Sequence, residues 1–184
     1  IDGNVPTVTS ITSTKTDAAY AVGATIPITI TFTQTVTITG TPQLTLETGT
    51  TDAVVDYASG TGTAILTFNY LIASGNNSSD LDYTSTSALA LNSGTIRDAS
   101  GNAATLTLPT PGATNSLGGN KALIIDTTSP TVSTVSSSKN DAAYKVGELI
   151  PINVNFDDKV YVTGTPQLTL LTGTTDAVVD YSSG

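Results

Sequence analysis

The chain lacks four residue types, since its 184 residues include no Cys, His, Met or Trp. Their absence excludes disulfide bonds, thiolate nucleophiles, histidine general bases, haem ligation and zinc sites of the usual kind. The sequence also has no apolar run long enough to span a membrane and no basic segment followed by an apolar leader. We therefore expect no membrane insertion in this segment.

Positive charge is scarce. Lys and Arg total 6 against 15 Asp and Glu, so the formal net charge is −9. A chain this acidic is repelled by the phosphates of nucleic acids and by anionic lipids, which makes both poor partners. Thirteen of the acids are Asp, and the other two are Glu47 and Glu148. Because Asp favours turns and hard cations whereas Glu favours helices, the acid content points to loops.

Threonine is abundant, with 37 residues, and its β-branched side chain suits the solvated face of a sheet. In Ile26–Thr39 the even positions are mostly apolar and the odd positions are mostly Thr, which predicts a half-buried antiparallel strand. Further strands are predicted at 42–46, 53–57, 64–71, 87–91, 104–108 and 122–125. No window of ten residues carries a helical stripe. The predicted fold class is all-β: an Ig-like antiparallel β-sandwich, repeated in tandem.

The chain contains an internal repeat. Residues 1–60 recur at 125–184 with an offset of 124 and no gap, and 38 of the 60 positions are identical. This period is too long for a solenoid unit and has the size of a domain. We therefore expect a complete unit at 1–126 and the truncated first half of a second, homologous unit at 127–184. A half unit would expose an apolar sheet face, so we expect either that the sequence is a fragment of a longer array or that something else completes the second unit.

The boundary between the repeats is the short segment Asp126–Pro130, with the sequence DTTSP. Proline fixes the direction of the backbone, and so short a segment predicts a stiff linker, not a flexible tether.

Three stretches carry a resemblance to a known family. They read VGATIPITITF…VTITGTPQLTLETGTTDAVVDYASGTGTAILTFNY, then DLDY…ALALNSGTIRDASGNAATLTLP, then ALIIDTTSPTV. In this order they resemble the tandem Ig-like repeats of very large bacterial surface proteins and adhesins, and the resemblance covers the whole chain. It implies a secreted, extracellular stalk of sandwiches in series, often made rigid by Ca²⁺, which holds a ligand-binding tip away from the cell.

Calcium at the junction of units is the sharpest hypothesis about a site. Ca²⁺ takes six to eight oxygen ligands, often from several loops. An Ig-like strand order would bring Asp126 of the linker close to Asp157 and Asp158, which follow Phe156. The equivalent segment of the first repeat carries Thr33 and Gln34 after the phenylalanine, which departs from the acidic pattern of the family. The alternative is that the two acids form a solvated turn with Lys159.

The start of the chain offers a similar group of residues: Asp2, together with Asp98 and Asn102 from a loop expected at the same pole. Alternatively, residues 98–102 form a plain hairpin loop, in which Asp98 makes an Asx turn and Gly101 adopts positive φ.

Two other features have ordinary explanations beside functional ones. Asp80 and Asp82 are candidates for a second cation site or a carbohydrate-facing loop, or else belong to a mobile surface loop. The alternate threonines at 29–39 are not shared by the second repeat, which carries other residues there, and they indicate the solvated face of a strand. Phe32, Phe68 and Phe156 are expected in the core.

These observations favour a structural spacer of roughly 40 Å per unit, from strands at about 3.3 Å per residue plus loops. Its expected partners are the neighbouring repeats of the same protein. No nucleophile–base pair and no Trp platform for sugars is visible, so we do not expect an enzyme. Two alternatives remain open. One is a module that binds a carbohydrate or receptor through loops 73–82 and 109–120. The other is a filament subunit that self-assembles when strands of another chain complete residues 125–184.

Overall fold

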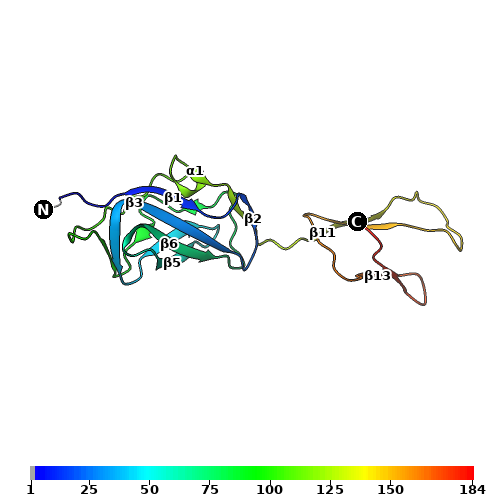
Figure 1. Cartoon of the computed structure of the whole chain (residues 1–184). Coiled ribbons are helices and arrows are strands. Elements are labelled where there is room, and N and C mark those ends of the chain that lie inside the picture. Colours follow the sequence, from blue (N-terminus) through cyan, green and yellow to red (C-terminus); the bar gives the residue numbers. More distant parts are fainter. Residues whose placement is uncertain (1–2) are drawn as a thin grey trace. The chain divides into compact units, whose positions relative to one another are not determined.

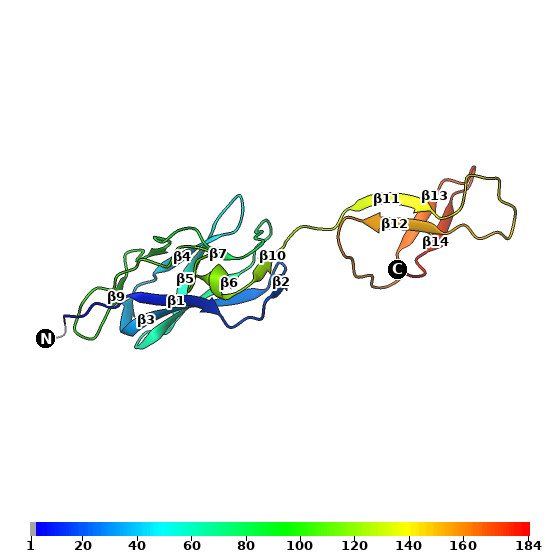
Figure 2. The same cartoon turned by 90° about the horizontal axis from the view of Figure 1, so that it is seen from above.

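The computed structural model describes residues 3–184 and divides the chain into two compact units, which end and begin at Thr128 and Ser129. The first unit is nearly all β (Figures 1 and 2). Its elements are β1 (Val8–Ser13), β2 (Ala18–Tyr20), β3 (Thr25–Thr39), β4 (Gln43–Glu47), β5 (Ala53–Ser59), β6 (Thr63–Leu71), β7 (Asp82–Tyr83), β8 (Leu89–Ala90), β9 (Thr95–Arg97), α1 (Leu117–Asn120) and β10 (Leu123–Ile125). This confirms the predicted all-β class.

The main sheet of the first unit has the strand order β1-β3-β6-β5-β4-β7, with β8 on β4 and β9 on β3. Strand β5 belongs to both layers, because its end at Tyr57 and Ser59 pairs with β6 while Ala53–Asp56 pairs with β4. The sheet thereby curls over on itself as an antiparallel sandwich. A separate pair of short strands, β10 and β2, is parallel.

Strand β3 follows the predicted alternation. Ile26, Ile28 and Ile30 are fully buried, whereas the intervening threonines are half-buried or exposed. The strand is long because it serves two partners: Thr25–Thr31 pair with β6, and Thr37–Thr39 pair with β9. The register shifts between Thr31 and Val36, where the strand passes from one partner to the next.

The core of the first unit draws on both halves of its sequence. Phe32 and Phe68 are buried in it, as predicted. Residues before position 61 contribute Ile11, Ile26, Ile28, Ile30, Phe32, Val36, Leu44, Leu46 and Val55. The later residues contribute Leu66, Phe68, Tyr70, Ile72, Leu81, Tyr83, Ala88, Leu89, Ile96, Leu108, Leu117, Leu123 and Ile125. Neither half supplies a closed core alone.

The predicted strand at 104–108 is wrong. Its backbone N–H groups donate to three different segments: Ala104 to Ile96, Thr105 to Pro6 and Leu108 to Thr86. Since no single neighbour runs alongside, the segment forms only an isolated bridge between Thr105 and Thr7, and no ladder.

The second unit consists of two separate antiparallel hairpins. The first joins β11 (Val132–Ser137) to β12 (Ile152–Phe156), and the second joins β13 (Gln167–Leu170) to β14 (Ala177–Asp180). Within residues 129–184, all of which are described, no residue is buried. The prediction that Phe156 lies in the core is therefore wrong: its side chain is 39% exposed, because no second layer covers β12 in these residues.

Among the residues that the structure describes, no helix has the length and apolar character needed to cross a membrane.

Candidate functional site

The candidate residues at 98–102 and at 126 lie at the two ends of the first unit, where the chain enters it and leaves it. Figure 2 shows the chain coming in at one end of this unit and leaving at the opposite end. At the first end Thr7 accepts a hydrogen bond from Thr33 N–H and forms a bridge with Thr105. At the second end the N–H of Asp126 donates to the carbonyl of Tyr20. We name these the N-terminal end and the C-terminal end.

At the C-terminal end, the loop that follows β6 is hydrogen-bonded to β10, the last strand of the first unit. Ser78 and Ile125 exchange two backbone hydrogen bonds of 2.8 Å each, and Leu81 N–H donates to Leu123. Asn77 N–H donates to Thr48, which ties the same loop to the body of the sandwich.

The linker is also bound to this loop. Thr127 N–H donates to Asn77 Oδ1 at 2.8 Å, and Gly75 N–H donates to the Thr127 hydroxyl at 3.0 Å. Because its first residues are fixed to the first unit, the linker segment without such contacts is confined to Ser129 and Pro130.

Asp126, the first residue of the linker, is also hydrogen-bonded at the C-terminal end. Its Oδ1 accepts a hydrogen bond from Thr128 N–H at 2.9 Å. Hydrogen bonds from the backbone and side chain of Thr128 hold the pKa of Asp126 below its usual range. The carboxylate therefore closes a local turn at the end of the first unit.

Asp157 and Asp158 lie in the second unit, directly after β12. Asp157 accepts two hydrogen bonds from Thr131, one from its hydroxyl at 2.6 Å and one from its N–H at 2.8 Å. These bonds lower the pKa of Asp157. Thr33 is the equivalent acceptor in the first unit, because its hydroxyl accepts a hydrogen bond from Thr7 N–H at 3.0 Å. Asp158 Oδ1 accepts from the N–H of Lys159.

Asp98 and Asn102 are brought together at the N-terminal end. Asp98 Oδ1 accepts from Asn102 N–H, and Oδ2 accepts from the Asn102 side-chain amide, both at 2.8 Å. Burial opposes ionisation, but the hydrogen bonds from Asn102 and the turn backbone prevail and lower the pKa of Asp98. Gly101 has φ of 88°. The loop is thus the predicted Asx turn, while Asp2 lies outside the described residues.

The donor chemistry of these residues suits calcium, but each carboxylate already accepts hydrogen bonds within its own unit. Asp126 belongs to the first unit, and Asp157 and Asp158 belong to the second. Within residues 3–184 no group of three or more acidic side chains is placed to hold a metal ion. Calcium at the junction stays a prediction.

Asp80 lies at the surface, whereas Leu81, Asp82 and Tyr83 beside it are buried. Asp82 Oδ2 accepts from Gly112 N–H at 2.8 Å, and the Tyr83 hydroxyl donates to the carbonyl of Pro109. Asp82 and Tyr83 therefore anchor the loop 109–120. Sequence reasoning missed this role, since the partners lie about 30 residues apart and leave no local signal.

The pKa of Asp80 is shifted in the opposite direction from those of Asp98, Asp126 and Asp157. Partial burial and the nearby charges of Asp82 and Asp17 raise its pKa. Asp17 itself pairs with Lys121 at 2.9 Å, which lowers the pKa of Asp17.

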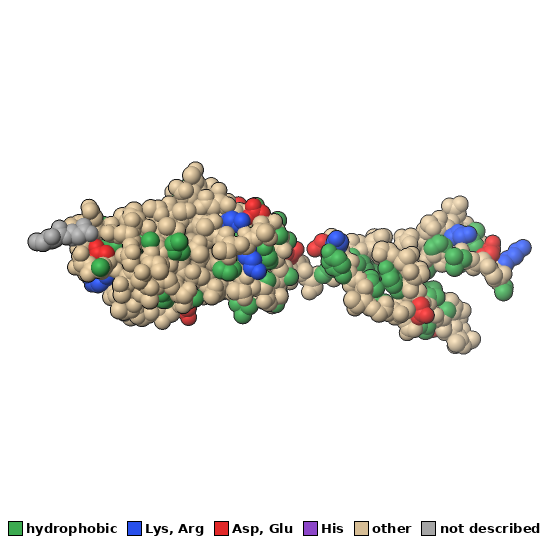
Figure 3. All heavy atoms as spheres, in the orientation of Figure 1, with side chains coloured by type: hydrophobic (Ala, Val, Ile, Leu, Met, Phe, Trp, Pro, Cys, Tyr) green, Lys and Arg blue, Asp and Glu red, His purple; other side chains and the backbone are tan. Residues whose placement is uncertain are grey.

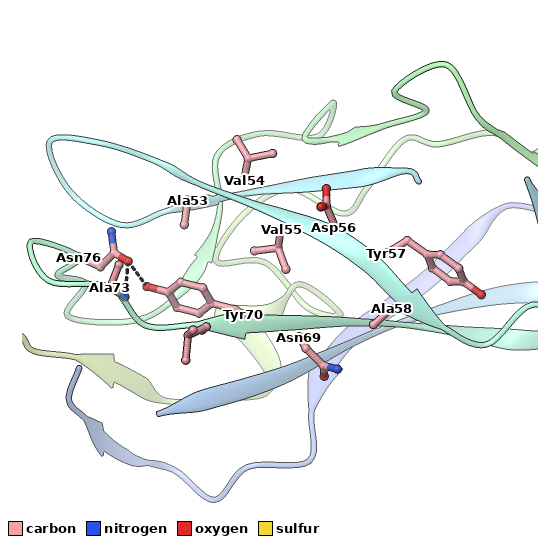
Figure 4. A pocket seen from close by; sticks show the side chains of 11 residues that line it. Ala53, Val54, Val55, Asp56, Tyr57, Ala58, Asn69, Tyr70, Ala73 and Asn76 are labelled. Atoms are coloured by element: carbon pink, nitrogen blue, oxygen red, sulfur yellow. Dashed lines mark hydrogen bonds between the residues drawn. The ribbon is translucent and has the colours of Figure 1, made fainter. Parts of the chain in front are cut away.

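An open hollow of about 540 Å³ lies where β5 leaves β6 to join β4 (Figure 4). On its floor the Tyr70 hydroxyl donates to Asn76 Oδ1 at 3.0 Å, and Ala73 N–H donates to the same oxygen. The exposed side chains of Val54 and Leu71 form part of its wall. The Tyr70–Asn76 bond explains the local structure of the loop after β6.

We found no family model that matches the chain, no curated protein that matches its sequence and no solved structure that matches its fold.

Proposed function

We propose that the chain is a structural spacer, a repeat segment of a secreted bacterial cell-surface adhesin or extracellular filament. The observation that carries the proposal is that the chain passes through the first unit from end to end, followed by a second copy of the same hairpins. A unit connected at opposite ends adds its full length to a stalk, whereas one connected at a single end adds little.

The strand arrangement suits a load applied through these two ends. Strand β1 begins at the N-terminal end and pairs antiparallel with β3 from Val8 to Ser13. A pull that moves β1 along its own axis must break these hydrogen bonds together, because they lie across the direction of the force. At the C-terminal end, the parallel pair β2–β10 is loaded in the same way.

The two loops that the alternative binding module would need make hydrogen bonds within the first unit. Loop 73–82 holds β10 and Thr127, and loop 109–120 is held by Asp82 and Tyr83. This observation supports the spacer over a carbohydrate or receptor site at these loops.

Force spectroscopy of the full chain tests the proposal. Because the chain has no cysteine, thiol handles attach only at introduced positions. Handles at Val5→Cys and Thr128→Cys pull through the unit, whereas handles at Val5→Cys and Thr35→Cys open β1 from β3 one bond at a time. We expect a higher rupture force in the first geometry and a length gain of about 400 Å, at about 3.3–3.6 Å per residue.

Equal rupture forces in the two geometries would contradict a load-bearing role. Specific binding of the full chain on a glycan array would favour the module instead.

Calcium at the junctions is part of the proposal and has its own test. A thermal melt of the full chain in Ca²⁺ and in EDTA should show a higher midpoint with Ca²⁺, equivalent to about 2.7 kcal/mol when free Ca²⁺ is a hundredfold above Kd. Asp126→Ala should reduce the shift. An unchanged midpoint removes calcium and leaves the spacer proposal intact.

A further inference from the structure

Strand β6 is the strand that unites the first unit. In the order β1-β3-β6-β5-β4 it lies between two hairpins, β1–β3 on one side and β5–β4 on the other. Phe68 is the clearest case, because it faces Ile28 of β3 and also Tyr57 of β5. Without β6 these hairpins would share no strand.

The second unit shows that situation. Hairpin β11–β12 corresponds to β1–β3 and hairpin β13–β14 corresponds to β5–β4, with registers displaced by 124 residues. Each is a two-stranded sheet of its own, and within residues 129–184 no strand lies between β12 and β14. One edge of each of these two strands is therefore open to a new strand.

The side chains that would face such a strand are apolar and lie in water. Ile150, Val154 and Val179 are 42%, 38% and 38% exposed, whereas their counterparts Ile26, Ile30 and Val55 are buried. Figure 3 shows hydrophobic side chains grouped on the surface of the second unit. Exposed apolar groups of this kind mark surfaces that become covered.

The substitutions between the two repeats lie mostly outside this apolar face. Of the nine core positions in the first half of the first unit, seven carry the same residue in the second unit, and the other two change from Ile to Val. The solvated positions of the same strand change freely, as in Thr29 to Asn153 and Thr31 to Asn155. The second unit therefore retains a face made for a buried partner.

The first unit identifies what that partner must be. Residues 61–126 cover the equivalent face, and Leu66, Phe68 and Tyr70 of β6 are buried in doing so. The same molecule cannot lend this segment without opening its own first unit. The covering segment must therefore come from outside residues 1–184.

We propose that β12 and β14 accept between them a segment with the sequence pattern of residues 61–126, supplied from outside residues 1–184. Its β6-like strand inserts antiparallel to both, with Leu66 of the donor opposite Val154 and Phe68 of the donor opposite Ile152, as follows from the β3–β6 register. Alternate apolar residues of the donor fill the core, and its backbone completes the sheet. The inference is independent of the spacer role, since binding is measurable without load.

The test adds a polypeptide of residues 61–126 to the full chain. We expect a 1:1 complex by sedimentation and slower hydrogen exchange in 150–156 and 177–181, with exchange in the first unit unchanged. A donor with Leu66→Asp should bind at least about 100-fold more weakly, because an apolar core position then carries a charge. The matched donor Thr67→Ser, changed on the solvated face, should bind as the unchanged segment does.

A change in the acceptor gives the reciprocal control. Val154→Asp should abolish the exchange protection, whereas Asn155→Asp on the other face should leave it in place. The proposal is overturned if the segment gives no protection or if Leu66→Asp protects equally well. It is also overturned if the full chain alone forms a dimer with 150–156 already protected, which would assign the face to a second copy.

Discussion

Residues 8–59 and 132–183 are two versions of one sequence in two different environments. Their hairpins have the same registers, including the same irregularity after Val8 and after Val132. Their burial differs throughout: Phe32 is 3% exposed and its counterpart Phe156 is 39% exposed. The comparison separates what local sequence determines, the hairpin, from what it does not determine, the core.

Local hydrogen bonds persist across the two versions. Gln43 donates to Asp56 at 2.8 Å, and the equivalent pair in the second unit is at 2.9 Å. Tyr57 N–H donates to the Pro42 carbonyl at 2.8 Å, and its counterpart bond is again 2.9 Å. Such short-range bonds form without a second layer, which explains why both units have the same turns.

The largest effect should come from the matched pair Phe32→Ala and Phe156→Ala. Truncating a buried phenylalanine costs about 3–5 kcal/mol. Truncating the half-exposed one should cost less than about 1 kcal/mol, because little packing is lost. Urea unfolding of the full chain, followed by hydrogen exchange within each unit, measures both. Similar costs would show that the second unit is covered in solution.

The second largest difference between the two units should be in their stability at alkaline pH. Burial raises the pKa of Tyr70 to about 12, and burial with the nearby Asp82 charge also raises the pKa of Tyr83. Since the folded pKa exceeds the unfolded value near 10, the stabilisation is fully present below pH 10 and is lost as the pH rises through the folded pKa. The loss for Tyr70, whose pKa is raised by about two units, should be about 3 kcal/mol.

The measurement is a spectroscopic titration of tyrosinate with circular dichroism recorded in parallel. The first unit should unfold above pH 10, and Tyr70→Phe should weaken that pH dependence. If Tyr70→Phe leaves the dependence unchanged, Tyr70 does not cause it.

Asp82→Ala tests the anchoring of the loop 109–120 in the first unit. The change leaves Gly112 N–H without its acceptor and should cost about 1–3 kcal/mol. Asp52→Ala and Asp176→Ala are the matched controls, because both aspartates are exposed. Each should leave the free energy of unfolding within about 0.5 kcal/mol of that of the unchanged chain. Urea unfolding measures all three, and equal costs would deny Asp82 its anchoring role.

The fold was predictable where one pattern runs for several residues. The alternation in β3 and the turn at Asp98 were both confirmed, because each depends on neighbours in sequence. Strands β1, β2, β7 and β9 and helix α1 were missed. All but β1 span only two to four residues, which carry no period.

The candidate site was less predictable, for a related reason. The sequence singled out Asp157 by its charge, but its partner Thr131 lies 26 residues away, and only the β11–β12 register brings them together. The burial of Asp82 depends likewise on Gly112, from a distant loop. Charge marks these residues as candidates, and only the topology shows what they bind.

The smallest effect is expected from Asp157→Thr, which gives the second unit the residue found at the equivalent Thr33. Both side chains accept a hydrogen bond from the N–H that starts the first strand, so stability near neutral pH should change little. The pH dependence should change more. Because the hydrogen bonds from Thr131 lower the pKa of Asp157, its stabilisation of β11–β12 is present above the unfolded value near 3.9 and is lost as the pH falls through the folded pKa.

Hydrogen exchange at Thr131, measured from pH 2 to 6 and corrected for intrinsic rates, should show this loss in the unchanged chain and not in Asp157→Thr. The Thr7 amide of the first unit, which faces a threonine already, is the internal reference. Loss of protection at Thr131 in Asp157→Thr at neutral pH would show that a threonine hydroxyl cannot replace the carboxylate as acceptor there. An unaltered amide would leave strand capping as a sufficient account of this acid, since a residue without charge then does the same work.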